Sequence, residues 1–303
     1  MAFWFGFPGS EKVFYREHKA RWAKVQEGRE GLAINNTFLT RFLTLVALHT
    51  TAKFHKLYGL CRLLSDKIII KTGFSVHLSE AVTMKCVAEH TSIPVPKRIQ
   101  SEDLESAMKK LSKSAREKIF LQLKNMVSQL KALEPPPGIG VKSCNGGSMY
   151  DPRLPHGKSR SGSFSTMQDF HRWLRQDLEP SQIGPHVSAQ EVDDLKAIIQ
   201  KQDGDRPPPV FTHCYLSPFN IMVRGEEIVG LIDWEISGWY PAYWEYTCAY
   251  FGNLTRTRWQ DTLCSLLEPF PEELEMEKVH KNGGVRLGSR TLSVILTTSH
   301  HAT

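Results

Sequence analysis

The chain has 303 residues, enough for one large domain or two smaller ones with sizeable cores. Hydrophobic residues make up 41% and charged residues 23%, close to the averages of globular proteins, which excludes wholesale disorder and fibrous or collagen-like structures. The 38 Lys and Arg exceed the 32 Asp and Glu, giving a net charge of +6 that is spread along the chain. A scattered basic excess is typical of a solvated surface, so we expect no nucleic-acid partner.

The cysteines and the apolar runs bound the environment of the chain. Six cysteines lie far apart without a C-x-x-C pair, which predicts neither a zinc site nor a disulfide framework and favours a reducing, cytoplasmic compartment. The longest apolar stretch, residues 38–48, spans about 11 residues and contains Arg41, whereas a membrane-spanning helix needs about 20. We therefore expect no signal peptide and no membrane span, and a buried or interfacial helix at this stretch.

The first predicted elements are a helical extension and a hairpin. Residues 1–59 carry scattered aromatic side chains and a mixed helical pattern. CRLLS (61–65) and KIIIK (67–71) follow as two short runs rich in branched residues around Asp66. Such runs separated by a turn residue predict a β-hairpin whose second strand ends at Lys71.

Residues 79–90 predict a helix. Ser79 is a candidate N-cap, and Glu80, Met84 and Val87 share one helical stripe. A carboxylate on the apolar side of a helix needs a partner, because an unpaired buried charge is costly. Alternatively, Glu80 lies in an exposed first turn, where an acid interacts favourably with the helix dipole. From the residues alone we favour the second interpretation.

The prolines of TSIPVP (91–96) exclude helix and predict extended backbone. A capping box at Ser114 and Glu117 then predicts a long helix that stops at the proline-rich turn of residues 135–138. We expect a surface loop over 138–166 and helices over 170–178 and 189–199. The predicted apolar stripe of the long helix consists of Ile119, Leu123, Met126 or Val127, Leu130 and Leu133.

The segment FTHCYLSPFNIMVRGEEIVGLIDWEISGWYPAYWEY (211–246) is the most informative in the chain. Residues 220–223 and 228–233 flank a short connection with a turn glycine, which predicts a hairpin. If Val223 faces Ile228, then Asn220 faces Leu231, and the strand period of two brings Asn220 and Asp233 to one face. An amide oxygen and a carboxylate there suit a hard cation such as nucleotide-bound Mg²⁺.

The run H-x-x-L-S-P-x-N-I-x-V, followed by I-D-W-E and G-W-Y-P-x-Y-W-E-Y, resembles the fungal branch of the aminoglycoside phosphotransferase and choline kinase-like family. The resemblance extends upstream to KIIIK, SEAVTMKCVAEHTSIPVP and QLKALEPPP, and covers about residues 60–277 with one gap. Members of this family are small-molecule kinases with a protein-kinase-like fold.

The resemblance implies roles for individual residues. Lys71 is similar to the strand lysine that contacts the α and β phosphates of ATP, and Glu80 to the helix carboxylate that orients it, which favours the ion-pair interpretation. Asn220 and Asp233 are similar to the two Mg²⁺ ligands, in agreement with the hairpin argument. His213 resembles a loop histidine that braces the backbone. Clustered aromatic residues usually serve a core, which we expect for Trp239, Tyr240, Trp244 and Tyr246.

One departure from the family pattern lies in the catalytic loop. The family loop reads His-Gly-Asp-Leu, with the aspartate as catalytic base, whereas this chain has HCYL at 213–216 and Tyr215 occupies the base position. A phenol with an ordinary pKa of about 10 is a poor proton acceptor at neutral pH. Because general-base catalysis contributes typically about 10² to 10⁴ in rate, its loss is severe, but slow transfer would survive.

A second departure is a shortening. In the family, two strands and the adenine-binding hinge lie between the proline-rich turn and the segment similar to SEDLESAMKKLS (101–112). Here only residues 97–100 lie between them, too few for two strands of about five to six residues each. We therefore expect a reduced upper sheet with an exposed edge and an incomplete adenine pocket. A degenerated hinge and a mis-assigned exon would leave the same sequence.

The predicted fold is α+β, a bilobal protein-kinase-like fold with a shortened N-terminal lobe and a mainly helical C-terminal lobe. We expect the extension at 1–59, the shortened lobe at 60–100, the C-terminal lobe at 101–277 and a disordered tail at 278–303. The implied function is Mg²⁺-dependent transfer of the γ-phosphate of ATP to a small-molecule hydroxyl, weak or absent because of Tyr215 and the missing hinge. The alternative is a non-catalytic, pseudokinase-type module that binds a small molecule or a partner protein.

Overall fold

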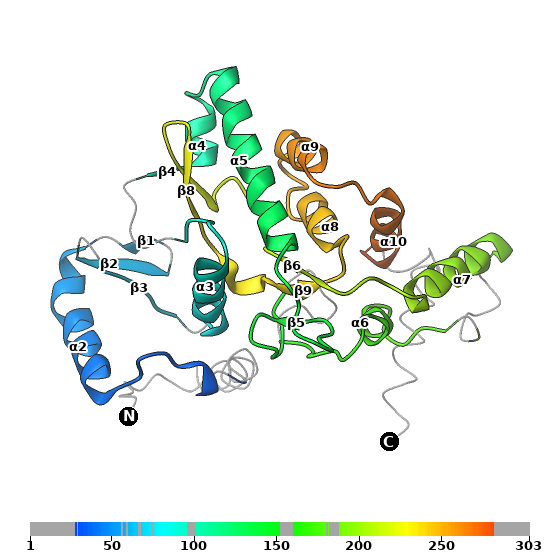
Figure 1. Cartoon of the computed structure of the whole chain (residues 1–303), viewed down its shortest axis with the longest axis horizontal. Coiled ribbons are helices and arrows are strands. Elements are labelled where there is room, and N and C mark those ends of the chain that lie inside the picture. The colour runs from blue at the N-terminus through cyan, green and yellow to red at the C-terminus, as the bar shows by residue number, and fades with distance from the viewer. Residues whose placement is uncertain are drawn as a thin grey trace, which may run out of the picture.

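Helices and short antiparallel strands alternate along the chain, which confirms the predicted α+β class (Figure 1). The computed structural model describes residues 28, 30–55, 57–58, 60–65, 68–73, 76–95, 101–151, 160–179, 181 and 188–281. Its α-helices are α2 Phe38–His49, α3 Ser79–His90, α4 Leu104–Met108, α5 Lys113–Lys131, α6 Met167–Leu174, α7 Ala189–Asp203, α8 Trp244–Phe251, α9 Thr257–Leu266 and α10 Pro271–Lys281. Its 3-10 helices include η1 Glu30–Leu32, η2 Thr51–Phe54 and η4 Trp234–Ile236. Its strands are β1 Leu57–Tyr58, β2 Cys61–Ser65, β3 Ile68–Lys71, β4 Glu102–Asp103, β5 Lys142–Ser143, β6 Val210–Thr212, β7 Ile221–Arg224, β8 Glu227–Leu231 and β9 Gly238–Tyr240.

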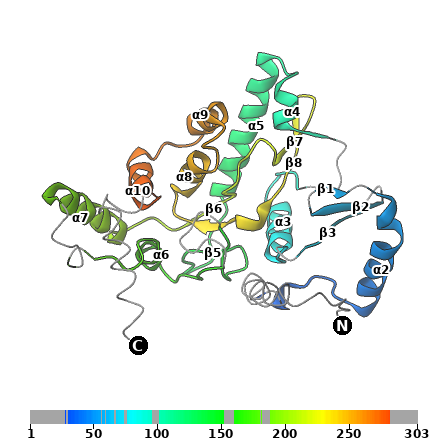
Figure 2. The same cartoon turned by 180° about the vertical axis from the view of Figure 1, so that it is seen from behind.

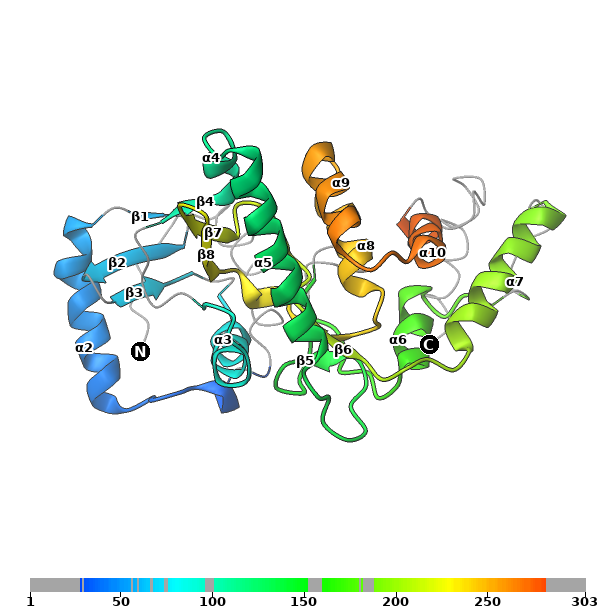
Figure 3. The ribbon, with the colours of Figure 1, turned by 45° about the horizontal axis from the view of Figure 1, so that its top comes forward.

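The strands form three small sheets, in the orders β1-β2-β3, β4-β7-β8 and β5-β9-β6. The first sheet and α2 lie at one end of the molecule, and α7 and α10 lie at the other, as three views agree (Figure 1, Figure 2 and Figure 3). Helix α5 and the second sheet lie between these ends. The described helices include none with the length and apolar character that crossing a membrane requires.

The predicted N-terminal hairpin is present. Strand β2 pairs antiparallel with β3, with Cys61 opposite Lys71, and β1 pairs with the other edge of β2. The predicted turn at residues 66–67 lies outside the described residues. Strand β3 is an edge strand, and its Ile68 and Ile69 side chains are exposed. The sheet that carries Lys71 is therefore thin and buries little apolar surface on its outer strand.

Helix α3 has the predicted bounds, but its N-cap is Leu78 and not Ser79. Ser79 is the first helical residue, and its backbone N–H donates to Nδ1 of His77. The helix buries Glu80, together with Thr83 and Val87 of the same face, and packs against η4. The interpretation of Glu80 as an exposed first-turn residue is therefore wrong, because the helix carries it to the end of strand β8.

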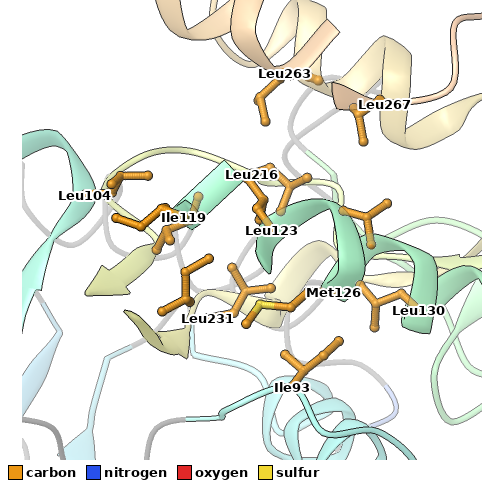
Figure 4. Close-up of a cluster of buried hydrophobic side chains, with 14 of the residues drawn as sticks. Ile93, Leu104, Ile119, Leu123, Met126, Leu130, Leu216, Leu231, Leu263 and Leu267 are labelled. Atoms are coloured by element: carbon orange, nitrogen blue, oxygen red, sulfur yellow. The ribbon is translucent and has the colours of Figure 1, made fainter. Parts of the chain in front are cut away.

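Helix α5 builds the main core. The predicted capping box at Ser114 is wrong, because the helix begins at Lys113 and the Ser112 hydroxyl accepts the N–H of Ala115. The apolar stripe is buried as predicted and packs against strands β6 and β8 (Figure 4). Its fully or largely buried members are Ile119, Leu123, Met126, Val127 and Leu130, with Leu133 partly buried.

A second core lies around α6. The helix begins at Met167, before the predicted residue 170, because Thr166 and Asp169 form a reciprocal capping box. It ends before the predicted residue 178, since Gln176 and Asp177 have φ angles of 55° and 58° that do not continue a right-handed helix. Helix α7 starts where predicted and continues past residue 199 to Asp203.

The aromatic cluster of the 211–246 segment lies in this part of the molecule. Phe170 of α6 contacts the rings of Tyr240 and Trp244 edge to face, with centroid separations of 6.1 and 5.1 Å. Trp239 is also buried, and Tyr246 is partly buried. These rings pack the C-terminal part of the molecule, as the sequence predicted.

Besides the turn at 66–67 and residues 1–27 of the predicted N-terminal extension, two predicted features lie outside the described residues. The segment that would carry a hinge, residues 96–100, is one of them. The other is most of the predicted C-terminal tail, residues 282–303. The described chain continues as helix α10 to Lys281, past residue 277, where we expected the C-terminal lobe to end.

Candidate functional site

Lys71 and Glu80 form a close ion pair. The Nζ atom of Lys71, at the end of β3, lies 3.0 Å from Oε1 and 2.7 Å from Oε2 of Glu80, in the first turn of α3. Burial lowers the pKa of Lys71, but the hydrogen bond and charge of Glu80 and the charge of Asp233 outweigh burial, so the pKa is raised. The ammonium group is therefore charged at neutral pH, and Glu80 fixes its direction.

Asp233, which lies 162 residues after Lys71 in the sequence, also contacts this pair. Its Oδ1 lies 3.4 Å from Nζ of Lys71, and its side chain is 29% exposed. Asp233 lies between strand β8 and η4, as the residue that directly precedes η4, and its φ angle of 69° turns the chain sharply there. One lysine thus bridges two carboxylates, one held by α3 and one by the end of the second sheet.

His213 braces the loop that precedes β7. Its ring is buried, and Nδ1 accepts the N–H of Tyr215 at 3.1 Å. Its Nε2 lies 3.0 Å from the carbonyl oxygen of Ile232, and with Nδ1 accepting, Nε2 carries the proton and donates. Burial lowers the pKa of His213 to about 3, against the raising effect of the Ile232 carbonyl. The ring is neutral, and both of its nitrogens bond to backbone groups. His213 thereby links the loop to Ile232, the residue before Asp233.

Glu245, which the sequence analysis did not single out, holds the same loop. Its Oε2 accepts the N–H of His213 at 2.7 Å, and its Oε1 accepts the N–H of Cys214 at 3.0 Å. Cys214 has a φ angle of 66°, a conformation unfavourable for a residue with a side chain, and these bonds stabilise it. The signal was present in the quoted motif, where Glu245 is the acid of W-E-Y within a run of aromatic residues.

Asn220 lies where the loop enters β7. Its Nδ2 donates to the carbonyl oxygen of Tyr215 at 3.0 Å, which leaves the amide oxygen directed elsewhere as an acceptor. The predicted register is partly wrong. Val223 faces Ile228 as predicted, but a bulge between Met222 and Val223 places Ile221, not Asn220, opposite Leu231. Asn220 instead pairs with Ile232, whose N–H donates to the Asn220 carbonyl oxygen at 3.0 Å.

The bulge changes the reason why Asn220 and Asp233 are neighbours in the fold. They do not share a strand face by simple alternation, because Asn220 is bonded to the residue that directly precedes Asp233. The two residues flank the open end of the β7–β8 hairpin, as expected, through this backbone bond and the positive φ of Asp233.

Tyr215 lies between His213 and Asn220 on the loop. Its backbone is fixed by both neighbours, through its N–H to His213 and its carbonyl oxygen to Asn220. Its side chain is 38% exposed. No described residue forms a hydrogen bond with its phenol oxygen. The loop therefore presents the partly exposed ring of Tyr215 at its surface.

Glu235 and Arg160 add charges that the sequence analysis missed. Burial and then the charge of Asp233 raise the pKa of Glu235 to about 7, with a smaller contribution from Glu80, against Lys71 and Arg160. Burial lowers the pKa of Arg160 to about 10, and its Nε donates to the hydroxyl of Ser148 at 3.0 Å. The I-D-W-E motif contained Glu235, but Arg160 lies in a polar loop where no pattern distinguishes it.

The donor set fits a hard divalent cation. Asp233 offers carboxylate oxygens and Asn220 an amide oxygen, the ligands that Mg²⁺ takes when phosphates and water complete its shell. Burial is the main reason why the pKa of Glu235 is raised, and the charges of Asp233 and Glu80 raise it further; a bound cation would offset the contribution of these two carboxylates. The described residues contain no cluster of three or more His, Cys, Asp and Glu in a metal-binding arrangement, so protein side chains alone do not complete a cage.

Comparison with known families decides the relationship. The model of the phosphotransferase enzyme family matches residues 102–271, which is more than half of the chain. The chain belongs to the phosphotransferase enzyme family. The predicted resemblance is thereby confirmed for the C-terminal part, including the 211–246 segment. The matched region begins at β4, so Lys71 and Glu80 lie upstream of it.

Two solved structures are similar to this phosphotransferase-family chain. Both are thermostable mutants of aminoglycoside phosphotransferase APH(4)-Ia in ternary complexes, one with ADP and hygromycin B and the other with AMP-PNP and hygromycin B. Each is 13% identical with a TM-score of 0.39, and the matches cover 71% and 72% of this chain and 72% and 74% of those chains. No curated protein matches the chain.

Proposed function

We propose that the chain binds Mg²⁺ and ATP and transfers the γ-phosphate to a small-molecule hydroxyl at a low rate. Membership of the phosphotransferase enzyme family supports the reaction class. The observation that supports the nucleotide site is the bridge of Lys71 to Glu80 and Asp233, at 2.7 and 3.4 Å. It brings together the lysine, the orienting carboxylate and one metal ligand that phosphoryl transfer uses.

Each residue has a distinct task in this proposal. The charged Nζ of Lys71 would contact the α and β phosphates, with Glu80 holding it in place. Asp233 and the amide oxygen of Asn220 would hold Mg²⁺, which neutralises phosphate charge as the terminal phosphoryl group is transferred. His213 and Glu245 would act only on the loop backbone, because their described contacts are with main-chain groups.

Tyr215 limits the rate in this proposal. The acceptor oxygen forms a bond to the γ-phosphorus while the bond to the β–γ bridging oxygen breaks, and ADP leaves. The acceptor hydroxyl must also lose its proton. A phenol lacks the basic carboxylate that would take that proton, so the proton passes to water and transfer is slower by about 10² to 10⁴ than with base assistance.

Replacing Tyr215 by aspartate tests this proposal. We expect Tyr215→Asp to raise the rate of ADP release from Mg²⁺ and ATP by about 10² to 10⁴, measured with water as the acceptor. Tyr215→Asn is the matched control, because asparagine has the size of aspartate but no basic carboxylate. The proposal is wrong if both variants equal the natural chain although ATP still binds in calorimetry.

The adenine wall is a separate part of the proposal. The hinge predicted to be missing lies outside the described residues, so the expectation of an incomplete pocket rests on the sequence. We expect ATP to bind weakly, with a dissociation constant above about 100 μM, because the phosphates supply most of the contacts. Micromolar binding by titration calorimetry would contradict it.

A second candidate function is a non-catalytic binding module. The exposure of two aromatic side chains on the loop favours it, since Tyr215 is 38% and Phe219 44% exposed, with the Arg256 guanidinium 4.9 Å from the Phe219 ring. Aromatic and Arg side chains are enriched at protein interfaces. This candidate predicts that Asn220→Ala and Asp233→Ala preserve the cellular role, whereas phosphoryl transfer predicts that both abolish it.

We also propose a cytoplasmic location. The six cysteines lie far apart in the sequence without a C-x-x-C pair, which suits a reducing compartment. Mapping by fluorescence microscopy of the tagged chain would test this, and a signal confined to a secretory compartment would contradict it.

A further inference from the structure

Helix α2 exposes nearly all of its apolar surface. The helix is well formed, because Thr37 and Thr40 make a reciprocal capping box, yet none of its residues is buried. Monomeric proteins rarely expose a contiguous apolar patch of more than a few hundred square ångströms unless it binds something. Its exposed apolar side chains, the α2 surface, are Phe38 (86%), Leu39 (62%), Phe42 (53%), Leu43 (55%), Leu45 (55%) and Val46 (43%).

The α2 surface is broad and exposed along the helix. At about 100° per residue, its six side chains cover an arc of roughly 160° of the helix. The opposite side carries Thr40, Thr44 and Arg41, and the least exposed residues are Ala47 and Leu48 at the C-terminal end. The views place α2 at the outer end of the molecule, beyond the first sheet (Figure 1 and Figure 3).

The neighbouring segment adds apolar exposure and positive charge. Helix η2 packs against α2, and its Phe54 side chain is 88% exposed. From Gly31 to Ser65 the sequence contains no Asp or Glu, while Lys and Arg occupy positions 41, 53, 56 and 62. Among these cations, Arg41 and Lys53 are exposed. An acid-free basic segment around an apolar face is complementary to a negatively charged, partly apolar surface.

Helix length excludes a spanning arrangement. Twelve residues extend about 18 Å, well short of a hydrocarbon core of about 30 Å. A short helix with phenylalanine and leucine on one face and threonine and arginine on the other can lie in the membrane plane.

We propose that α2 binds the surface of a membrane rich in anionic lipids, with its apolar side chains inserted and Arg41 and Lys53 at the headgroups. The apolar arc of α2 is wider than the narrow seam that each helix buries in a helix pair. Its width therefore favours a membrane surface over a second copy of the chain as the partner of α2. The proposal goes beyond phosphoryl transfer and does not depend on it. It would place the phosphotransferase site next to an anionic membrane surface.

Vesicle flotation of the full chain tests the proposal. We expect the chain to float with phosphatidylcholine vesicles containing about 30% phosphatidylserine, and to bind pure phosphatidylcholine at least about tenfold more weakly. The paired substitution Phe38→Ser and Phe42→Ser should reduce binding by about tenfold or more, since both rings are exposed and stack on each other at 6.4 Å. Leu121→Ser on α5 is the matched control, because Leu121 is 69% exposed elsewhere in the fold and should not alter binding.

The charge and oligomer measurements complete the test. Arg41→Gln with Lys53→Gln should weaken binding to the anionic vesicles and leave binding to neutral ones unchanged. Circular dichroism would establish that every variant keeps its helices. Absence of the natural chain from the floated fraction, or equal binding to both vesicles, would overturn the proposal. Sedimentation velocity would show whether the chain forms a dimer. If it does, and if the phenylalanine substitutions dissociate that dimer, the α2 surface binds a second copy of the chain and the membrane proposal is overturned.

Discussion

The second sheet and the first sheet differ in how they hold their functional residues. In the second, Ile221, Val223 and Leu231 are all 0–1% exposed and belong to the same core cluster as the apolar stripe of α5. In the first, Ile68 and Ile69 of the edge strand are 53% and 42% exposed. The proposed metal ligands therefore flank a buried hairpin, Asn220 before it and Asp233 after it, while Lys71 ends a thin sheet with an exposed edge.

The position of Lys71 therefore depends on contacts between the first sheet and the rest of the molecule. Its ion pairs reach Glu80 of α3 and Asp233 beyond β8. Helix α3 packs on η4, and the backbone N–H of Leu231 donates to the carbonyl oxygen of Pro94 at 2.9 Å. Side-chain charges and a few backbone bonds, not a shared core strand, bring Lys71 to the site.

The largest stability effect should come from the buried hairpin. Ile221→Ala leaves a cavity at a fully buried position and should lower the free energy of unfolding by about 2–5 kcal/mol. Urea denaturation followed by tryptophan fluorescence would measure it. A loss below about 1 kcal/mol would show that the second sheet is not the better packed of the two.

Removing the loop anchor should have the next largest effect. Glu245→Gln replaces a charge-assisted acceptor by a neutral amide, one end of which cannot accept the N–H of Cys214, and should cost about 1.5–3 kcal/mol. Thermal unfolding would measure the loss. Glu272→Gln, which changes an 80% exposed acid of α10 paired with Lys201, is the control and should cost clearly less stability than Glu245→Gln, because solvent screens an exposed ion pair. Equal losses would refute a special role for Glu245.

His213 predicts how stability depends on pH. The pKa of His213 is about 3 in the folded chain against an ordinary value of 6.5. Above pH 6.5 the ring is neutral in both the folded and the unfolded chain, so its titration does not make stability depend on pH there. As the pH falls below 6.5, only the unfolded chain takes up this proton, and stability should fall by about 1.4 kcal/mol per pH unit. Urea midpoints at pH 7.5, 6.5 and 5.5 would measure the slope. His213→Gln should be less stable at pH 7.5 but have a flatter slope, and an unchanged slope would contradict the assignment.

The smallest effect should come from the edge of the first sheet. Ile69→Thr keeps a β-branched side chain at a position that is 42% exposed, so the free energy of unfolding should change by less than about 0.5 kcal/mol. The same urea experiment would measure it beside Ile221→Ala. A loss of 2 kcal/mol or more would mean that a partner surface covers this strand in solution.

The sequence by itself determined the elements whose signals are local. Periodicity located α3 and the buried stripe of α5, and alternating runs with turn residues located both hairpins. The motif run from His213 onward predicted the family that the comparison then established. Such features depend on spacing along a few turns of chain, which a single sequence displays in full.

Only the tertiary structure decided how the site is assembled. The residues alone favoured an exposed Glu80, and its burial against Lys71 depends on α3 packing over η4. The bulge that places Asn220 opposite Ile232, and the carboxylate of Glu245 under the loop, likewise come from contacts between distant segments. A local pattern carries no information about which charge from elsewhere in the chain will satisfy a buried group, because that choice is made by packing.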